Sequence, residues 1–352
     1  MPLLSVAIPI YNNARYVRAA IESVLVQTFA DFELILCDDG STDGTQEIIR
    51  SIQDPRIILS INPKNLGIVG NFNRCVSLCT GEFITLFHND DLMLPRNLEM
   101  KVLALRAHPQ AGFVHSNFFV IDEKGDVIEL PSNNQNSKSP DSIDYARGRI
   151  GVGMEKFNKG GHWSVMPAHD SVMSSSDCFQ RLLFEENFIC CPSVMIRRRC
   201  HEALGVYDER LPYTSDYEMW LRVSLACDSV YLAEPLIQYR LHQTNLTNTF
   251  QGKRKIVGQD QTRLAKRLAL ARFQGLTPRF TLDKKKLAGL YSEMGQFYFW
   301  TEEFKTAREM FRDGLRYGVF RLQTLAYYLL TFIPTGLLRI LKKINKKLRK
   351  VA

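Results

Sequence analysis

The sequence of 352 residues lacks the phosphate-binding motifs of several large enzyme classes. Neither GxGxxG nor GxxxxGK followed by Ser or Thr occurs in it, so dinucleotide binding of the Rossmann type and P-loop chemistry are not supported. The eight cysteines contain no CxxC pair and no zinc-ligand spacing, and several lie in apolar stretches, where cysteine packs as a small hydrophobic side chain. This pattern predicts a reducing compartment.

Both ends of the chain also lack something. The N-terminal stretch MPLLSVAIPIYNN has no basic segment and no small-residue cleavage site, so we interpret it as the first strand of the fold and not as a signal peptide. Between Arg339 and Lys350 there is no acidic residue, and the basic residues of this tail carry most of the net charge of +8. The body of the chain is therefore nearly neutral, which argues against a nucleic-acid-binding face.

Apolar runs and helical patterns alternate through the N-terminal part of the chain. The runs LSVAIPI, FELILC, RIILSIN and EFITLF predict strands. Apolar residues at helical spacing predict helices from Arg15 to Gln27, Thr45 to Ile52, Asn71 to Cys79 and Arg96 to Ala107. Strands that alternate with helices in this way form βαβ units, so we predict an α/β fold with a mostly parallel central sheet flanked by helices.

Polar clusters directly follow three of the predicted strands. Parallel sheets bind ligands beyond the carboxyl ends of their strands, so we expect a ligand site where these clusters meet. The clusters are Tyr11-Asn12, Asp38-Asp39 and Asn89-Asp90-Asp91.

The last segment of the chain, residues 319–352, combines an apolar run with the basic tail. The uncharged run from Leu322 to Leu338 contains 17 residues and a proline at 334, which is at the short limit for spanning a bilayer. Together with the tail, it predicts a shallow or in-plane anchor on an anionic membrane surface. The alternative is a helix packed on the rest of the protein, followed by a solvated tail.

Seven short stretches in a fixed order carry a resemblance to a known family. Between Ser5 and Thr247 they are VAIPIYN, ILCDDGSTDGT, NLGIVGNFN, GEFITLFHNDDLMLP, PSVMIRR, LGVYDERLPYTSDYEMWLR and YRLHQTNLT. Together they resemble an inverting family-2 glycosyltransferase with the GT-A nucleotide-diphospho-sugar transferase fold. We accordingly expect a GT-A domain at 1–245 (a nucleotide-binding half at 1–100 and an acceptor-binding half at 101–245), a helical extension at 246–318 and a membrane-associating segment at 319–352.

The resemblance implies transfer of a sugar from a nucleotide-diphosphate donor to a hydroxyl of a lipid-linked or cell-surface glycan precursor, with the enzyme peripheral on the cytoplasmic face of the plasma membrane. The departing diphosphate needs neutralising charge, which Mg²⁺ or Mn²⁺ held by carboxylates supplies. The acceptor hydroxyl loses a proton as it attacks, so a carboxylate is needed as general base. UDP donors are expected first because Asp39 suits the uracil N–H group. Thymine offers the same group, and GDP donors also stay open.

The resemblance also implies roles for individual residues. Asp216 matches the catalytic base, and Asp91 and His242 match contacts to the metal or the diphosphate. Glu218 is implied as a substrate contact that orients Arg222 or the acceptor. The residues implied in donor binding are Pro9, Tyr11, Asn12, Asp39, Asn65, Gly67 and Asp90.

His88 departs from the family pattern, which often has an aspartate at this position, and it leaves the full set of metal ligands open. It also motivates an alternative function, a non-catalytic nucleotide-sugar-binding or scaffold module. The presence of both Asp91 and Asp216 argues against that alternative, because paired acidic groups in a cleft favour catalysis. A third hypothesis, nucleotidyl transfer, would need a basic, glycine-rich loop after the first strand, where this chain has IPIYNNARY.

Overall fold

The computed structural model describes residues 2–128, 169–185, 187–245, 253–275, 280–317 and 322–333. The chain forms two compact units, residues 1–277 and 278–352, and each is described by itself. Most of the predicted membrane-associating segment lies outside the described residues. Within them, no helix combines the length and the apolar composition that crossing a bilayer requires. The predicted domain boundaries at 245 and 318 stay predictions.

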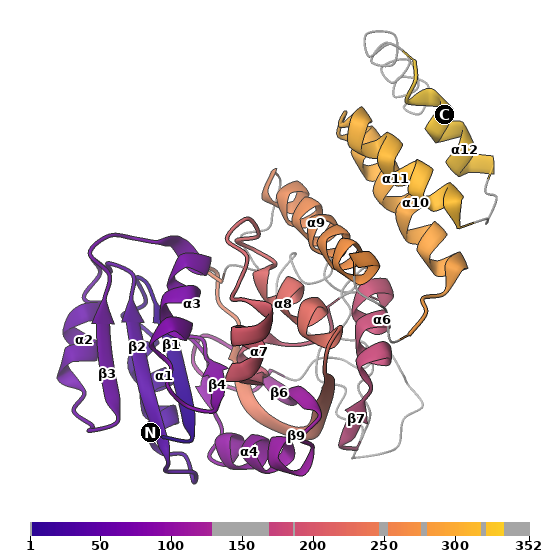
Figure 1. The fold of residues 1–352 in the computed structure, drawn as a ribbon. Helices are drawn as coiled ribbons and strands as arrows, with labels where there is room; N and C mark the ends of the chain where they lie inside the picture. The colour runs from indigo at the N-terminus through magenta and orange to yellow at the C-terminus, as the bar shows by residue number, and fades with distance from the viewer. Residues whose placement is uncertain are drawn as a thin grey trace. The chain divides into compact units, whose positions relative to one another are not determined.

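The first unit is built on one mixed sheet with the strand order β3-β2-β1-β4-β8-β6-β9-β5, and β7 pairs with β9 (Figure 1). Strands β3, β2, β1 and β4 are parallel to one another, as predicted, and β6 is parallel to β9. Strands β8, β5 and β7 join antiparallel. The strands are β1 Leu4–Ile10, β2 Phe32–Asp38, β3 Ile57–Ile61, β4 Phe83–Leu86, β5 Leu92–Met93, β6 Ala111–Ile121, β7 Ser171–Met173, β8 Met195–Arg197 and β9 Asp228–Arg240.

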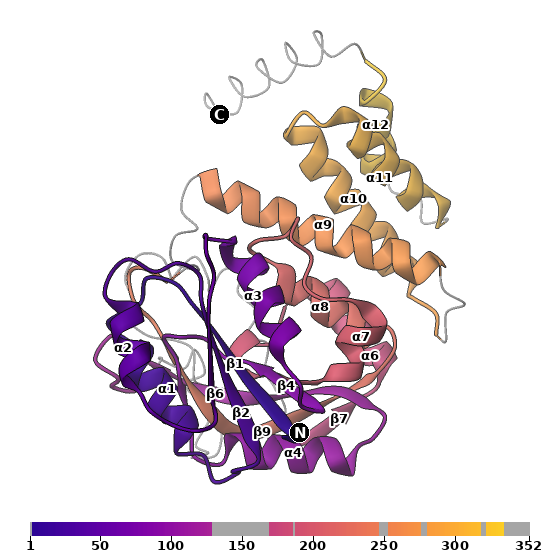
Figure 2. The ribbon, with the colours of Figure 1, turned by 60° about the vertical axis from the view of Figure 1, so that its left-hand side comes forward.

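Helices cover both faces of this sheet, with α1 and α2 on one side and α3 on the other (Figure 2). Helix α3 packs on β1, β2 and β4, whereas α1 packs on β1, β5 and α2. The helices of the first unit are α1 Val17–Leu25, α2 Thr45–Ser51, α3 Gly67–Leu78, α4 Asn97–Ala107, α6 Ser175–Glu185, α7 Arg198–Leu204, α8 Ser215–Ser224 and α9 Lys253–Gly275. The helices predicted in the N-terminal part are confirmed to within a few residues.

The core explains why the first two strands are mostly apolar. Every residue of β2 is buried, and in β1 only Pro9 is partly exposed. A parallel sheet covered on both faces has no solvated side, so its strands carry continuous apolar runs instead of an alternating pattern. Burial on both faces also fixes the register, in which Ile10 at the end of β1 pairs with Asp38 at the end of β2. The polar residues that follow both strands therefore emerge at one edge.

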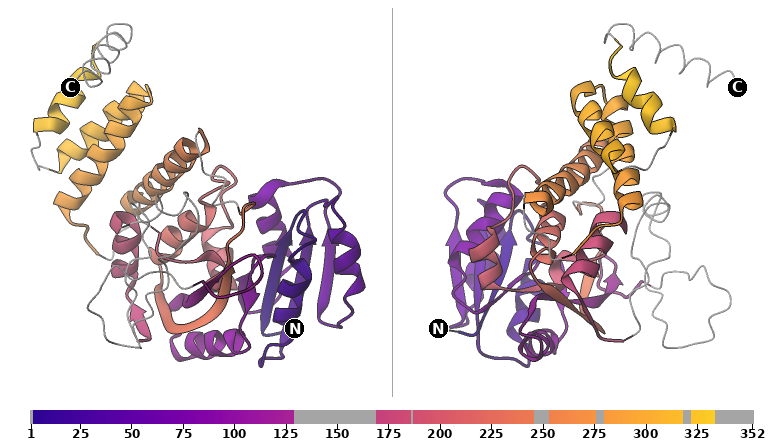
Figure 3. Two further views of the ribbon diagram at one scale, coloured as in Figure 1. Left: turned by 180° about the vertical axis from the view of Figure 1, so that it is seen from behind. Right: turned by 45° about the vertical axis from the view of Figure 1, so that its right-hand side comes forward.

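Strand β9 brings a distant part of the chain to the same edge. It is 13 residues long and runs parallel to β6, with register shifts around Ser116 and Asn117. Such irregularities increase the bend of a strand, and β9 is strongly curved in Figure 3. It ends at Arg240, whose backbone N–H donates to Asp91 Oδ1 at 2.8 Å. The end of β9 is thereby fixed to the loop that follows β4.

The second unit consists, within its described residues, of three helices: α10 Lys284–Trp300, α11 Phe304–Arg316 and α12 Leu322–Leu330. Helices α10 and α11 form a closely packed hairpin. A Cβ atom on Gly295 would lie 2.5 Å from the Phe311 ring, so the two helices approach each other where α10 has no side chain. Tyr327 of α12 packs its ring on both Phe299 and Phe311.

Candidate active site

The first corner of the site follows β1. Asn12 has a φ of 45°, a left-handed conformation that asparagine tolerates better than most residues. Its backbone N–H donates to Ser41 Oγ at 2.9 Å, and its Oδ1 accepts from the Thr42 N–H at 2.8 Å. These bonds join the loop after β1 to the loop after β2. The neighbouring Tyr11 side chain is 50% exposed and available to a ligand.

The second corner is centred on Asp39, the predicted nucleobase contact. Its side chain is buried, and both carboxylate oxygens accept hydrogen bonds. Oδ1 accepts from Asn62 Nδ2 and from the Leu66 N–H, both at 2.8 Å, and Oδ2 accepts from the Gly67 N–H at 3.0 Å. Since Gly67 begins α3, the Asp39 carboxylate satisfies N–H groups at the start of that helix. Asn65 donates from Nδ2 to the Asp39 carbonyl at 3.2 Å.

A chain of buried amides supports Asp39 from behind. Asn62 Nδ2 also donates to Asn71 Oδ1 at 3.0 Å, and Asn71 Nδ2 donates to the Cys37 carbonyl at 3.0 Å. Asn62 and Asn71 are both buried. A buried polar network in which each amide has a partner holds one geometry, so Asp39 and the start of α3 are fixed relative to β2.

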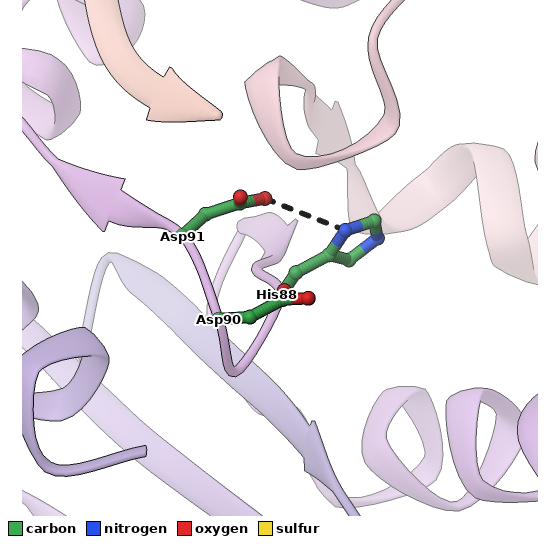
Figure 4. A group of neighbouring side chains, drawn as sticks. All are labelled: His88, Asp90 and Asp91. Carbon is green, nitrogen blue, oxygen red and sulfur yellow. Dashed lines mark ion pairs between the residues drawn. The ribbon is translucent and has the colours of Figure 1, made fainter. Parts of the chain in front are cut away.

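The third corner follows β4 and contains Asp91, which is fully buried. Its Oδ1 is held by Arg240, whereas its Oδ2 has no hydrogen-bond partner among the described residues. Instead, His88 points toward it, with Nδ1 3.5 Å from Asp91 Oδ2 (Figure 4). Burial and the charge of the adjacent Asp90 raise the pKa of Asp91 to about 6. Burial lowers the pKa of His88, but the neighbouring Asp91 and Cys191 outweigh this effect, so that the pKa stands well above its ordinary value.

Asp90 is held by residues from the end of β9. Its Oδ2 lies 3.0 Å from His242 Nε2, and its carbonyl accepts from Arg240 Nε at 2.8 Å. The other ring nitrogen of His242, Nδ1, lies 2.8 Å from Thr244 Oγ1. Both nitrogens of His242 are therefore engaged in this arrangement. His242, predicted as a contact to the metal or the diphosphate, supports the Asp90 carboxylate here.

The residues of this corner fit a divalent cation. His88, Asp90 and Asp91 each offer one ligand atom, and these atoms lie within 4.8 Å of one another. The buried Asp91 Oδ2 has no hydrogen bond in the described structure, and a cation would satisfy it. Carboxylate oxygens are ligands for Mg²⁺ and Mn²⁺, and an imidazole nitrogen is a ligand for transition metals.

Asp216, the predicted base, is the second residue of α8 and is half-buried. Burial raises the pKa of its carboxyl group, while hydrogen bonds from the backbone of Tyr217 and from the Asn187 side chain, and the charge of His88, partly oppose this rise. The influence of His88 places Asp216 within electrostatic reach of the Asp91 corner. A carboxylate with a raised pKa is a stronger base than one at its ordinary pKa.

Glu218 stands two residues after Asp216 on α8 and is more deeply buried. Its side chain is 1% exposed, with Oε2 2.7 Å from Arg222 Nη2 and Oε1 bonded to Arg272 of α9. Arg222 in turn donates to the carbonyls of Leu204, Gly205 and Val206. Of the two partners considered for Glu218, Arg222 and the acceptor, the structure shows the contact with Arg222. Because both oxygens are occupied by arginines, Glu218 offers no open oxygen to a substrate here.

Sequence reasoning missed two residues that hold the site together. The Arg240 guanidinium connects the Asp90 and Asp122 carbonyls and stacks over the Tyr16 ring at 4.9 Å. Asn13 donates from Nδ2 to Asn89 Oδ1 at 2.7 Å, which ties the end of β1 to the end of β4. Arg240 stands within the YRLHQTNLT stretch and Asn13 directly follows VAIPIYN, so their positions beside two motifs were the available signal.

Comparisons with known proteins agree with this geometry. Residues 5–205, more than half of the chain, match the family model described as Glycosyl transferase family 2, and residues 167–272 match one described as Glycosyltransferase like family 2. An uncharacterized glycosyltransferase of Rickettsia typhi is 28% identical over 250 residues, which are 70% of this chain and 67% of that protein. The putative glycosyltransferase EpsE of Bacillus subtilis is 40% identical over 127 residues, which are 35% of this chain and 46% of that protein.

Solved structures support the fold. The crystal structure of Staphylococcus aureus TarS residues 1–349 in complex with UDP-GlcNAc matches 93% of this chain and 90% of that one, with a TM-score of 0.56 and 14% identity. At this identity the likeness concerns the fold, and it confirms the predicted GT-A architecture. From its sequence motifs, its sheet and the family model, the chain belongs to glycosyltransferase family 2.

Proposed function

We propose that this protein transfers a sugar from a nucleotide-diphosphate donor to an acceptor hydroxyl with inversion, using Asp216 as general base and a divalent cation held at Asp91. The observation that carries the proposal is Asp216 itself, a half-buried carboxylate with a raised pKa beside the His88–Asp91 corner. That corner lies at the same sheet edge as the donor residues after β1 and β2. A general base together with a corner that can hold a phosphate-bound cation suits direct displacement at a sugar carbon.

Each group of residues then has a role that follows from its position. The nucleotide lies against Pro9, Tyr11, Asn12, Asp39, Asn65 and Gly67, with Asp39 fixing the loop before α3 as well as meeting the base. Asp90, held by His242, contacts the ribose or the sugar. Asp216 removes the proton of the attacking hydroxyl, and Glu218 positions α8 through Arg222. Mg²⁺ or Mn²⁺, when bound, neutralises the charge of the leaving diphosphate.

A donor screen tests this function. The full chain is incubated with UDP-, GDP- and dTDP-sugars and with Mg²⁺ or Mn²⁺, and the released nucleotide is measured. UDP-GlcNAc is the first donor to test, since it is bound by TarS, a protein of similar fold. We expect Asp216→Asn to reduce transfer about a thousandfold or more, because the general base is lost, and to leave the affinity for the nucleotide unchanged.

The matched control is Asp126→Asn, at an exposed turn after β6, a residue that is not assigned to the site. It should transfer sugar at the wild-type rate. Turnover retained by Asp216→Asn would disprove the assignment of the base. Nucleotide binding without transfer or donor hydrolysis, for any donor and either cation, would favour the non-catalytic binding module.

We further propose that the acceptor is a lipid-linked or cell-surface glycan precursor and that the C-terminal segment holds the enzyme on the cytoplasmic face of the plasma membrane. The basic tail supports this, because lysines near an anionic surface contribute about 1 kcal/mol each. Binding to phosphatidylserine-containing vesicles, measured by sedimentation, should therefore weaken about thirtyfold in a Lys342→Gln, Lys343→Gln variant, which loses two of these lysines. The exposed pair at the start of α10, changed as Lys284→Gln, Lys285→Gln, is the matched control. Equal binding by both variants would contradict a role for the tail.

A further inference from the structure

We infer that His88 is a nitrogen ligand of the bound cation and makes this site prefer a transition-metal ion, such as Mn²⁺ or Co²⁺, over Mg²⁺. The inference rests on the proposed function, because it names the class of cation at the same site. It concerns the one position in the β4 loop where this chain departs from its family's usual aspartate.

The orientation of the His88 ring is set by its neighbours. The side chain is 28% exposed, and its ring is stacked against Phe72 of α3, with ring centroids 6.5 Å apart. Phe72 in turn packs edge-on against Tyr207, with centroids 5.6 Å apart. These contacts support the imidazole from the side of α3, and its Nδ1 faces Asp91 (Figure 4).

The separation of His88 and Asp91 suits two ligands of one cation. The Nδ1–Oδ2 distance is 3.5 Å. Two ligands at about 2.1–2.2 Å from a cation, on neighbouring coordination positions, lie about 3.0–3.5 Å apart. Asp91 Oδ2 is the buried oxygen that lacks a hydrogen bond, while Oδ1 is fixed by the Arg240 N–H. The carboxylate is thus anchored at one oxygen and directed at His88 with the other.

The other imidazole of this corner is engaged elsewhere. His242 Nε2 bonds to Asp90 and its Nδ1 to Thr244, so His242 acts as a support for a carboxylate. His88, Asp90 and Asp91 are the residues whose ligand atoms gather within 4.8 Å. The ligand set of the described site therefore mixes one nitrogen with carboxylate oxygens.

A mixed nitrogen and oxygen set discriminates between cations. Mg²⁺ takes oxygen ligands and retains several waters, so it gains little from an imidazole. Affinity for nitrogen-containing sites rises from Mn²⁺ to Co²⁺ along the first-row series. An aspartate at the position of His88 would supply an oxygen and a negative charge, and this would favour Mg²⁺. His88 is therefore the residue that determines the cation preference.

Calorimetric titration of the full chain with MgCl₂, MnCl₂ and CoCl₂, in the presence of UDP, tests the inference. The wild type should bind Co²⁺ and Mn²⁺ more tightly than Mg²⁺, and His88→Asp should reduce the ratio of Co²⁺ to Mg²⁺ affinity about 10–100-fold. His108→Asp, at the end of α4 and outside the site, is the matched control and should keep the wild-type ratio. Pulsed EPR of bound Mn²⁺ should show nitrogen coupling in the wild type and in His108→Asp, but not in His88→Asp.

Two results with the variants would overturn the inference. One is an unchanged cation preference in a His88→Asp protein that melts at the wild-type temperature. The other is nitrogen coupling that persists in His88→Asp and disappears in His242→Gln, which would assign the ligand to His242. If the wild type binds UDP and its affinity for Mg²⁺ equals its affinity for Co²⁺, this inference fails and the proposed function stands. If it binds neither UDP nor any of the cations, the proposed function fails with it.

Discussion

Two buried aspartates at the same edge of the sheet, Asp39 and Asp91, differ in how their carboxylate oxygens are hydrogen-bonded. At the end of β2, both oxygens of Asp39 accept hydrogen bonds, from Asn62, Leu66 and Gly67. At the end of β4, Asp91 has one oxygen fixed by a backbone N–H and one oxygen that is buried without a hydrogen bond. Both side chains are almost completely buried, so solvent does not explain the difference.

The difference indicates that the two carboxylates have different roles, one structural and one in binding a ligand. A carboxylate whose oxygens are all satisfied by backbone and amide N–H groups fixes a loop, and its ionised form is stabilised by those bonds. A buried carboxylate with an unsatisfied oxygen costs stability and persists where another requirement outweighs that cost. Asp39 therefore fixes the loop before α3, whereas Asp91 keeps one oxygen without a hydrogen bond, and this is the oxygen that we propose for the cation.

Among the variants that test this comparison, Asp91→Asn gives the largest expected effect. The variant retains an oxygen for the Arg240 N–H but loses the negative charge, so we expect transfer to fall about a thousandfold. Stability should rise. The folded-state pKa of about 6 exceeds the unfolded value, so the wild type loses stability as pH rises from about 4 to 6, and the variant does not. Urea unfolding at pH 7 should show a gain on the order of 1–3 kcal/mol.

A loss of stability in Asp91→Asn would contradict this view, because it would mean that the charged carboxylate is well satisfied in the apo protein. Asp126→Asn again serves as the control and should change neither transfer nor the free energy of unfolding. Repeating the unfolding of the wild type at pH 4.5 and pH 7 gives an independent check, since the difference between the two proteins should shrink at the lower pH.

Asp39→Asn should behave in the opposite way at the first of the two corners. Asparagine has one acceptor oxygen, and its amide group would face either the Leu66 or the Gly67 N–H group. We expect a loss of about 3 kcal/mol in the free energy of unfolding, because hydrogen bonds to a charged acceptor are replaced by an unsatisfied donor pair. Calorimetry with UDP should show weaker binding. A variant that binds UDP less well at unchanged stability would show that Asp39 serves the ligand and not the loop.

The regions around Asp39 and Asp91 also show which features could be predicted from the sequence. The strands and helices that carry Asp39 and Asp91 could be predicted because apolar periodicity is a local property of the chain. The stretch CCPSVMIRR has the composition of a strand, yet only Met195–Arg197 form β8, and Cys191–Ser193 is a short 3₁₀ turn. Pro192 near the start of that turn has no N–H to donate to a neighbouring strand, which gives the physical reason.

Contacts between distant segments of the chain could not be predicted from the sequence. Motif positions indicated Asp39, but not that the N–H groups of Leu66 and Gly67 would occupy its oxygens. Glu218 contacts Arg272, which lies 54 residues away on α9, a helix whose packing no local pattern specifies. Side-chain partners of this kind depend on the tertiary arrangement, so the sequence can indicate which residues matter before it indicates what each one contacts.

A change at Lys101 of α4 gives the smallest expected effect on transfer. It tests whether a buried charged group without a hydrogen bond marks function even when it lies outside the site. It is fully buried, its Nζ has no hydrogen bond in the described structure, and burial lowers its pKa to about 7. If a buried, unsatisfied charge always marked function, Lys101→Met would impair transfer. We expect instead unchanged transfer, because in the described structure no hydrogen bond joins Lys101 Nζ to a residue assigned to the site.

The measurable signature of Lys101 is pH-dependent stability. Its folded pKa lies below the unfolded value near 10.4, so between pH 7 and 10 the unfolded chain binds more protons and the stability of the wild type rises with pH. From pH 7 to 9 this gain should be about 2 kcal/mol, and Lys101→Met should lack it while being the more stable protein at pH 7. Urea unfolding of both proteins at pH 7, 8 and 9 measures the difference. Impaired transfer at unchanged stability would instead give Lys101 a functional role comparable with that of Asp91.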